Sequence, residues 1–375
     1  MPNWSFETYT ACPTSGNEAP PPWTMPTSGS ADYFNPCAPS GSNSVPYHPG
    51  GGFQNPKDGF AFEGVFLLNG FGWEYREYIQ AQLTNSLTSG NCYYVEFYTN
   101  LYNESKYATN NIAANFSSIP YGTTGTATVL NAPQHITRYG NPIIKDTMNW
   151  VQVSGLYVAG GGEKYICLGN FKTNANTDTM TINTSMSVYW GTYCYFDAVS
   201  VYSINPTGTL PWTYSNTSVA VGDSVYIGNT VGGTFTSDWY NYSGGFIKSG
   251  AGIYVKPVTT STYVVQFTVC GVPRSDTLTV TVTGTGFDEL RFNNDELRIS
   301  PNPNNGVFDL EILSKEFIIA DSELRIVNVL GQEIRKEKLL SKKQKINLEE
   351  LVSGVYYLQL VKQGKALVAK KILKE

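Results

Sequence analysis

The chain has 375 residues, a formal net charge of −5 and only 15% charged residues, while 14% of its residues are aromatic. This length suits two or three domains, and the composition excludes a charge-rich disordered chain. A net negative charge argues against a nucleic-acid binder, which needs a basic surface. The only two histidines, His48 and His135, also exclude a metal site built from several imidazoles.

The average charge hides two different regions. Residues 1–290 contain 10 basic and 18 acidic residues, whereas residues 291–375 contain 15 and 12. All 6 cysteines and all 7 tryptophans lie in the first region. The change of composition near residues 284–294 predicts a boundary between an aromatic, weakly charged body and a charged C-terminal module.

The cysteines bear on the cellular compartment. No run approaches the roughly 18 apolar residues of a membrane-spanning helix, and the N-terminal residues lack the basic and apolar parts of a signal peptide. This leaves a cytoplasmic protein or the mature form of an exported one. Cys12 and Cys37 lie in loops rich in Pro, Gly and Ser, where we expect a disulfide, and this favours export. We expect Cys92 and Cys270 to be small buried thiols in strands.

Alternating apolar and polar residues predict strands through residues 1–204. Residues 74–83 place Ile79 and Ala81 on one face, and residues 92–101 place Val95 and Phe97 on one face. Long loops rich in Gly, Pro, Asn and Ser separate such segments. An antiparallel β-sandwich is the predicted architecture.

The opposite faces of these two segments combine aromatic rings, an arginine and carboxylates, which suits a shallow site for a polar ligand such as a glycan. We expect the two segments to share a sheet. Trp73, Tyr33, Phe34 and Tyr47 in loops could extend the site. The alternative is that these residues form the core of the other face or a face that the long loops cover. A further alternative is a hydrolase that uses Glu74 or Glu96, although no nucleophile, phosphate-binding or metalloprotease motif occurs. The candidate ligand-binding residues are Glu74, Arg76, Tyr78, Tyr94, Glu96 and Tyr98.

Two smaller β-domains follow. Residues 205–285 contain short strands every 8–12 positions, which predicts an immunoglobulin-like sandwich with Trp239 in its core. Residues 286–296 form a predicted linker. Residues 297–375 predict a second small sandwich, because Phe308, Leu310 and Ile312 alternate with acidic residues as in a half-buried strand.

The C-terminal sequence resembles the sorting domain of proteins exported by the type IX secretion system. Its segments PNPNNG (301–306), NVLGQ (328–332) and SGVY (353–356) and its basic end follow the order of that family's motifs. The resemblance implies a sorting signal formed by Pro301, Asn302, Pro303, Gly306, Gly331, Gly354, Tyr356, Lys370 and Lys371.

This resemblance implies export from a bacterium of the phylum Bacteroidota, with the secretion machinery and its sortase-like peptidase as partners. In that family the domain is usually removed, and the cargo is released or anchored on the outer-membrane surface. We therefore expect a secreted or surface-anchored protein without a membrane span.

The N-terminal domain resembles galactose-binding-like jelly rolls, including carbohydrate-binding modules of families 4 and 22. The segments PNWSFE (2–7) and YFDAVSV (195–201) carry the resemblance, which implies a jelly roll over residues 1–204 whose first and last strands pair. It also implies a structural Ca²⁺ near Glu7 and Asp197, although Ala198 replaces a second aspartate; solvated or hydrogen-bonded acids are the alternative. The expected function is glycan binding without catalysis, with an adhesin that makes protein contacts as the alternative.

Overall fold

The computed structural model describes residues 1–14, 16–39, 42–48, 52–122, 125–184, 190–229, 237–283, 296–314, 317–320, 322–362 and 365–375. The chain forms two compact units, Met1–Thr283 and Gly284–Glu375. The described residues are almost entirely strands and loops, with one short 3-10 turn, η2 (Asn174–Asn176). The all-β architecture predicted from the sequence is confirmed.

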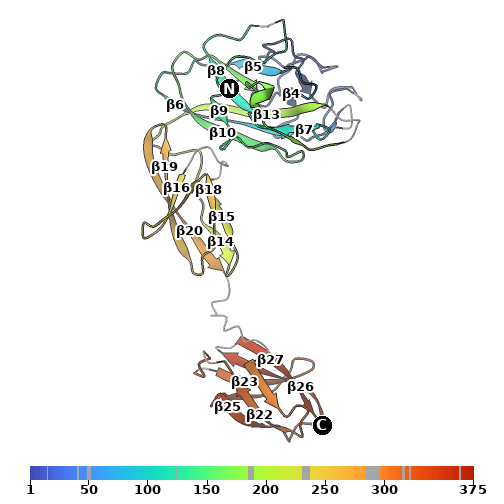
Figure 1. The fold of residues 1–375 in the computed structure, drawn as a ribbon, viewed down its shortest axis with the longest axis vertical. Helices are drawn as coiled ribbons and strands as arrows, with labels where there is room; N and C mark the ends of the chain where they lie inside the picture. The colour runs from blue at the N-terminus through green and yellow to red at the C-terminus, as the bar shows by residue number, and fades with distance from the viewer. Residues whose placement is uncertain are drawn as a thin grey trace. The chain divides into compact units, whose positions relative to one another are not determined.

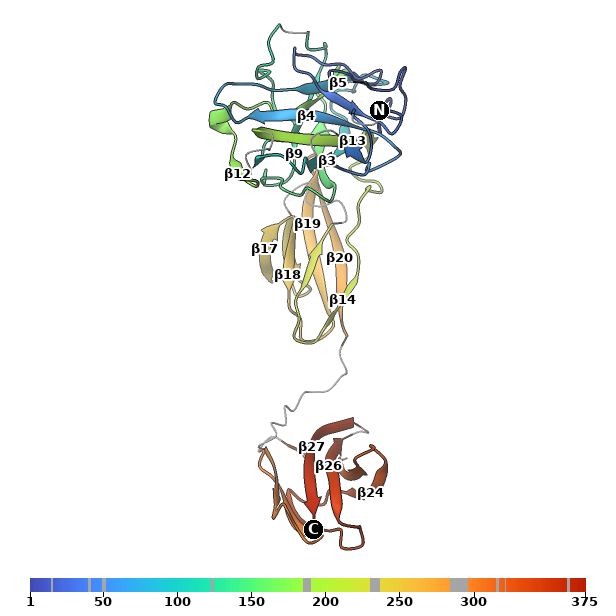
Figure 2. The ribbon, with the colours of Figure 1, turned by 90° about the vertical axis from the view of Figure 1, so that its right-hand side faces the viewer.

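Two antiparallel sheets form the jelly-roll sandwich of residues 1–204 (Figures 1 and 2). The first sheet has the order β1-β4-β13-β6-β10, with bounds Asp32–Phe34, Phe62–Asn69, Gly191–Ile204, Cys92–Leu101 and Val151–Val158. The second has the order β5-β11-β8-β9, with bounds Tyr78–Gln82, Tyr165–Gly169, Ala113–Ser117 and Ile136–Thr137. Two short pairs lie in the loops, β2 (Tyr47–His48) with β3 (Gly52–Phe53) and β7 (Tyr107–Thr109) with β12 (Thr179–Thr181).

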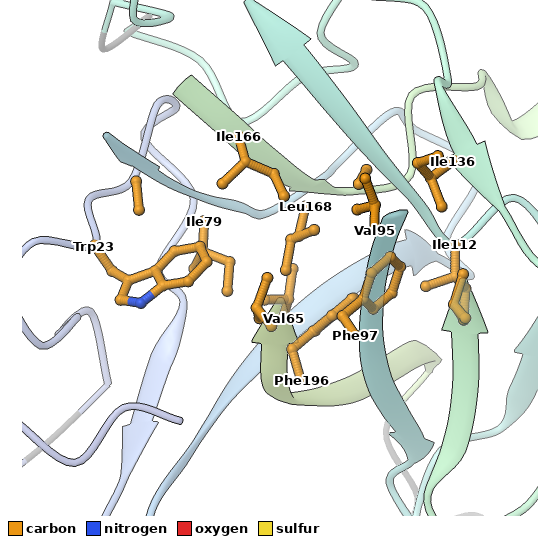
Figure 3. Packing of buried hydrophobic residues seen from close by; sticks show 14 of the residues in the cluster. Trp23, Val65, Ile79, Val95, Phe97, Ile112, Ile136, Ile166, Leu168 and Phe196 are labelled. Atoms are coloured by element: carbon orange, nitrogen blue, oxygen red, sulfur yellow. The ribbon is translucent and has the colours of Figure 1, made fainter. Parts of the chain in front are cut away.

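The core of the jelly roll lies between these two sheets. Val95 and Phe97 of β6 meet Ile79 of β5 and Leu168 of β11 in one buried cluster (Figure 3). These side chains occupy the faces that the period of two predicts. Strand periodicity therefore determines which face of each sheet is inward.

The outer faces of both sheets are also largely covered. Phe34 and Phe62 pack there with Tyr102, Tyr193 and Tyr195 in a second apolar cluster, outside the first sheet. Outside the second sheet, a third cluster joins strand residues to loop residues and consists of Tyr78, Ala113, Leu130, Cys167 and Phe171. The long loops therefore act as a further packed layer on the sandwich.

Several carboxylates are buried within the jelly roll. Glu63 of β4 has no exposed surface, and among the residues that the structure describes neither of its carboxylate oxygens has a hydrogen-bond partner. Burial raises the pKa of Glu63 well above its usual value. Burial also raises the pKa of Asp32 to about 6 and raises the pKa of Glu77. Tyr193 donates a hydrogen bond to Asp32 at 2.5 Å, and the backbone of Phe66 donates one to Glu77 at 2.8 Å. Of these three carboxylates, Glu63 alone has no hydrogen-bond partner within the described part of the chain.

The immunoglobulin-like sandwich packs around Trp239, which is fully buried as predicted. Its larger sheet has the order β14-β20-β19-β16-β17, with bounds Thr217–Ala220, Val272–Thr283, Ser261–Val269, Ser237–Asn241 and Phe246–Gly250. Its smaller sheet pairs β15 (Val225–Gly228) with β18 (Gly252–Val255).

The immunoglobulin-like sandwich is bonded to the jelly roll. Cys92 at the start of β6 and Cys270 after β19 form a disulfide, with Cα atoms 5.9 Å apart. Tyr94, Ile204 and Trp212 belong to the same apolar cluster as the core of the immunoglobulin-like sandwich. The prediction that Cys92 and Cys270 are free thiols was wrong, because the 178 residues between them hide their proximity.

The second unit is a small sandwich of two sheets. The first has the order β21-β22-β25, with bounds Leu297–Ser300, Val307–Ile312 and Lys343–Asn347. The second has the order β24-β23-β26-β27, with bounds Glu333–Lys338, Ser322–Asn328, Gly354–Lys362 and Lys365–Lys374. Phe308, Leu310 and Ile312 point into its core, as their alternation predicts.

Candidate functional site

The six predicted ligand-binding residues divide between two sheets. Glu74, Arg76 and Tyr78 belong to the segment that enters β5, whereas Tyr94, Glu96 and Tyr98 lie in β6. Since β5 and β6 belong to different sheets, the expectation that both segments share one sheet was wrong. The predicted patch is therefore not one continuous surface.

The residues near β5 hold loops in place. Arg76 has no exposed surface; its guanidinium donates to the carbonyl of Lys172 at 3.0 Å and to Asn174 at 2.8 Å, and it lies 3.5 Å from Glu74. The hydroxyl of Tyr78 donates to the carbonyl of Asn170 and accepts from the backbone of Leu130. Loops from distant parts of the chain bury Arg76 and Tyr78, so neither offers a ligand-binding surface.

The residues of β6 lie on the outer face of the five-stranded sheet. Tyr94 is buried against Trp212, with ring centroids 5.7 Å apart, beside the immunoglobulin-like sandwich. Glu96 and Tyr98, by contrast, are only half-buried. The accessible part of this face therefore begins at Glu96 and continues away from the immunoglobulin-like sandwich.

A polar strip crosses this accessible face. The amide of Gln152 in β10 donates to the carboxylate of Glu96 at 2.7 Å, and the hydroxyl of Tyr94 donates to it at 3.2 Å. The ammonium of Lys57 lies 4.5 Å above the ring centroid of Tyr98. These contacts fix a carboxylate, an amide, a cation and an aromatic ring within one short stretch of the sheet.

Lys57 also lines a cleft of about 470 Å³. Phe53, Met148 and Trp150 give the cleft apolar surface, and Asn103 and several other amides give it polar surface. The indole of Trp150 donates to the carbonyl of Asn55 at 2.8 Å, and the backbone of Phe53 donates to Asn103 at 3.2 Å. The walls of the cleft are therefore tied to one another by hydrogen bonds.

Glu7 and Asp197 anchor the loop that forms one wall of this cleft. Glu7 Oε1 accepts the backbone N–H groups of Phe60 at 2.7 Å and Ala61 at 3.1 Å. Asp197 Oδ2 accepts those of Lys57 at 2.7 Å and Asp58 at 3.1 Å, while its Oδ1 accepts that of Ala198 at 2.6 Å. The two acids thus bind successive backbone amides of one loop.

This arrangement does not fit a calcium ion. Hard cations require six to eight oxygen ligands, whereas N–H groups surround the carboxylate oxygens of Asp197. Burial raises the pKa of Asp197 to about 8. Across the part of the chain that the structure describes, no group of three or more His, Cys, Asp and Glu side chains could hold a metal. The geometry agrees with the alternative of hydrogen-bonded acids.

The resemblance implies that the first and last strands of the jelly roll pair, but the two ends of the domain make a different contact. Residues 2–6 form a turn and a bend, and the backbone of Val199 donates to the carbonyl of Trp4 at 2.8 Å. A bulge interrupts the pairing of β13 with β6 between Asp197 and Ser200. Ala198 adopts a positive φ of 52° inside this bulge. The bulge presents Val199 to the N-terminal turn.

The structure contains an exposed group of stacked aromatic rings. The sequence predicted only one member of this group, Trp73, as a candidate. Phe71 stacks on Trp73 with centroids 5.3 Å apart and on Trp190 with centroids 5.6 Å apart. The ammonium of Lys106 lies 3.2 Å above the ring of Trp190. These four residues, here called the aromatic ladder, come from three distant segments. The three rings are 57%, 58% and 36% exposed for Phe71, Trp73 and Trp190, respectively.

The other aromatic candidates have different environments. Tyr33 and Phe34 lie in β1 rather than in a loop, and both are buried. Tyr47 is exposed and packs against Phe53 at the cleft, with centroids 5.0 Å apart. His135 packs at a tilt against Tyr157, with ring centroids 4.8 Å apart, and accepts the backbone N–H of Phe116; burial lowers its pKa. These packing and hydrogen-bond contacts give His135 a structural role.

The cysteines in the N-terminal loops are also bonded. Cys12 and Cys37 form a disulfide with Cα atoms 5.5 Å apart. Cys167 and Cys194 are free and buried. Both disulfides fit an oxidising compartment.

The sorting-signal residues come together at one end of the second unit. Asn302 donates its amide to the carbonyl of Lys371 at 2.7 Å and accepts the backbone N–H of Leu373 at 2.8 Å. Gly354 pairs with Lys374, and Tyr356 pairs with Asn328 at the turn that contains Gly331. Gly306 has a φ of 104°, and a Cβ there would lie 2.8 Å from Lys374. The separate motifs therefore form one structural feature, which the order of the motifs alone does not show.

Comparison with solved structures gives only remote likenesses. The family 22 carbohydrate-binding and GH10 modules of xylanase 10B from Clostridium thermocellum, complexed with xylohexaose, share 10% identity over 44% of this chain and 28% of that one, with a TM-score of 0.23. The tandem family 22 modules of Paenibacillus barcinonensis Xyn10C share 11% over 98% and 87%, with a TM-score of 0.26. Immunoglobulin domains 1–5 of Sidekick-1 share 11% over 99% and 78%, with a TM-score of 0.24. These values are too low to transfer a ligand.

No curated protein matches the sequence. No helix among the described residues is long and apolar enough to cross a membrane. The family model for the secretion system C-terminal sorting domain matches residues 298–375. The second unit is therefore a secretion system C-terminal sorting domain, as its motifs predict.

Proposed function

We propose that this chain is exported by the type IX secretion system and that its jelly roll binds a glycan at the cell surface or outside the cell. The sorting domain supports export. The two disulfides of the first unit suit the oxidising compartments that an exported chain enters. In this proposal the second unit carries the export signal, and the first unit is the exported cargo.

The cleft beside Lys57 is the observation that carries the glycan proposal. A sugar presents apolar ring faces and many hydroxyl groups, so its site needs exposed rings beside amides and charges. Phe53 and Trp150 supply rings, and Lys57 and Asn103 supply polar groups. The strip formed by Tyr98, Gln152 and Glu96 gives a longer glycan further partners on the same face.

A glycan array probed with the full chain tests this proposal. We expect binding to at least one glycan, lowered about tenfold or more by the double variant Phe53→Ala/Lys57→Ala, since ring and charge contacts are each worth about 1 kcal/mol. Tyr242→Ala removes an equally large exposed ring from the immunoglobulin-like sandwich and provides a matched control. No binding across the array, or equal loss in the control, would refute the proposal.

The aromatic ladder favours a second candidate function, an adhesin that makes protein contacts. Exposed Trp and Phe side chains beside a cation are typical of protein-interface hot spots. Phe71 and Trp73 offer such a surface, since their stacked rings are 57% and 58% exposed. Phe71→Ser/Trp73→Ser should then abolish adhesion of cells that display the protein while leaving array binding intact; unchanged adhesion would reject this role.

The third candidate, a hydrolase, has less support. Glu74 binds the backbone of Asn174 and lies beside Arg76, whereas Glu96 binds Gln152 on the other sheet. Glycosidases need two carboxylates that flank one bond. Polysaccharide turnover that disappears in both Glu74→Gln and Glu96→Gln would revive this candidate.

A further inference from the structure

The cleft beside Lys57 carries a single charge. Among the described residues that line it, Lys57 is the only charged one, and the others are apolar or uncharged polar residues such as Trp150 and Asn103. Residues 1–204 contain 7 basic and 13 acidic residues, so the acidic composition of the jelly roll does not predict such a site. A cleft with charge of one sign raises the local concentration of ligands of the opposite sign. This cleft therefore favours an anionic ligand over a neutral one.

Lys57 is held in place at both ends. Its backbone N–H donates to Asp197 Oδ2 at 2.7 Å, and its ammonium lies 4.5 Å from the ring centroid of Tyr98. The face of a ring attracts a cation without neutralising its charge. Within the described part of the chain, no acid forms an ion pair with Lys57 at 4.0 Å or less. A cation fixed in this way loses little conformational entropy when a ligand anion binds it.

The acids closest to the cleft in the chain, or on the strip beside it, are bonded to protein donors. Three such acids are Glu96, Asp146 and Glu104. Gln152 donates to the first at 2.7 Å, the backbone of Met148 donates to the second at 2.9 Å, and Asn103 donates to the third at 3.3 Å. These carboxylates therefore stabilise the walls of the cleft and the strip, and they leave the charge of Lys57 to be paired by a ligand.

We propose that the cleft selects an anionic glycan, in which one sugar carries a carboxylate or a sulfate group. The anionic group accepts hydrogen bonds from the ammonium of Lys57, while Phe53 and Trp150 contact the apolar faces of the sugar rings. Sugars further along the strip offer hydroxyl groups to Glu96 and Gln152, and the charge of Glu96 disfavours a second anionic group there. This specificity rests on the proposed glycan binding and adds the chemical class of the glycan.

An array of matched oligosaccharide pairs, probed with the full chain, tests this specificity. Each pair consists of a uronate-containing oligosaccharide and its methyl ester, or of a sulfated oligosaccharide and its desulfated form. We expect the charged member of at least one pair to bind about fivefold or more tightly than its neutral partner. The two kinds of pair distinguish a carboxylate from a sulfate. An increase from about 0.05 to about 0.5 M NaCl should reduce the difference, because salt screens an exposed charge.

Substitutions of Lys57 show whether this side chain causes the preference. Lys57→Met removes the charge and keeps an unbranched side chain, so it should bring the two members of the pair within about twofold of each other. Continued binding of the neutral member shows that this variant is folded. Lys57→Arg should keep the preference, because it keeps the charge. Lys164→Met is the matched control, since Lys164 is also exposed and precedes β11 in the other sheet.

The outcomes separate this specificity from glycan binding itself. If no glycan binds, charged or neutral, the proposed function of the jelly roll fails. If neutral members bind at least as tightly as their charged partners in every pair, glycan binding stands and the selection of anionic glycans is wrong. A preference that survives Lys57→Met, or that Lys164→Met also removes, would overturn the role of Lys57.

Discussion

Cys92 of the jelly roll is bonded to Cys270 of the immunoglobulin-like sandwich across 178 residues. The bond lies beside a shared apolar cluster that contains Tyr94, Ile204 and Trp212. A spacer that merely connects two domains needs no such bond. The immunoglobulin-like sandwich therefore stabilises the jelly roll and closes one end of the sheet face that carries Glu96 and Tyr98.

Loss of this bond should be costly. In the chain-entropy model, closing a loop of this length is worth about 5 kcal/mol, against about 3.5 kcal/mol for the 25-residue loop between Cys12 and Cys37. We expect Cys92→Ala/Cys270→Ala to lower the free energy of unfolding more than Cys12→Ala/Cys37→Ala does, by denaturant titration without reductant. A thiol assay of the denatured, unreduced chain should find two free thiols, Cys167 and Cys194. Four or six would contradict the pairing.

Glu63 should weaken the fold at neutral pH. Its pKa is raised by burial, so the folded state binds the proton more tightly than the unfolded state does. Stability is therefore highest below the unfolded pKa and falls as pH rises toward the folded pKa. Glu63→Gln should raise the free energy of unfolding at pH 7 by about 1–3 kcal/mol and reduce this fall, since a neutral amide costs less to bury. A lower stability of the variant at pH 7 would indicate that Glu63 has a partner.

We expect Asp197 to stabilise the fold by anchoring the loop that contains Lys57 and Asp58, and not by binding calcium. Asp197→Asn replaces an acceptor by an amide donor that faces backbone N–H groups, at a cost of about 1–3 kcal/mol. Addition of Ca²⁺ should leave the melting temperature of the unchanged, metal-free chain where it is. A rise that disappears in Asp197→Asn and Glu7→Gln would establish a calcium site at these two carboxylates.

Arg76 should be needed for stability and not for ligand binding. Removal of its buried guanidinium in Arg76→Ala frees the loop near Lys172 and Asn174, at a cost of about 3–5 kcal/mol. At a temperature where the variant is folded, its glycan affinity should match that of the unchanged chain. Loss of affinity without loss of stability would place Arg76 in the binding site.

Local patterns in the sequence predict the strands and their inward faces. The segments of β6 and β10 and the core positions of Val95 and Phe97 follow from a period of two. The motifs of the sorting domain identify its family, because they are short and follow one another in a fixed order. These features depend on residues that are neighbours in the chain.

Contacts between distant segments explain what the sequence does not predict. The alternation in its segment predicts that Tyr78 is exposed. In the structure, loops that carry Leu130 and Asn170 cover it, and both residues form hydrogen bonds with its hydroxyl. The aromatic ladder needs Phe71 and Trp190 to meet across about 120 residues. The cleft likewise joins Phe53 to Trp150. A periodic pattern describes residues within one strand and does not predict these contacts. The contacts depend on the paths by which the long loops fold back onto the sandwich.

A titration of the full chain with the strongest glycan from the array decides whether the cleft beside Lys57 is the glycan site. We expect saturable binding that Phe53→Ala/Lys57→Ala weakens about tenfold or more, while Phe71→Ser/Trp73→Ser leaves it unchanged. Binding that depends on the aromatic ladder, or that survives loss of Phe53 and Lys57, would contradict the assignment of the glycan to the cleft.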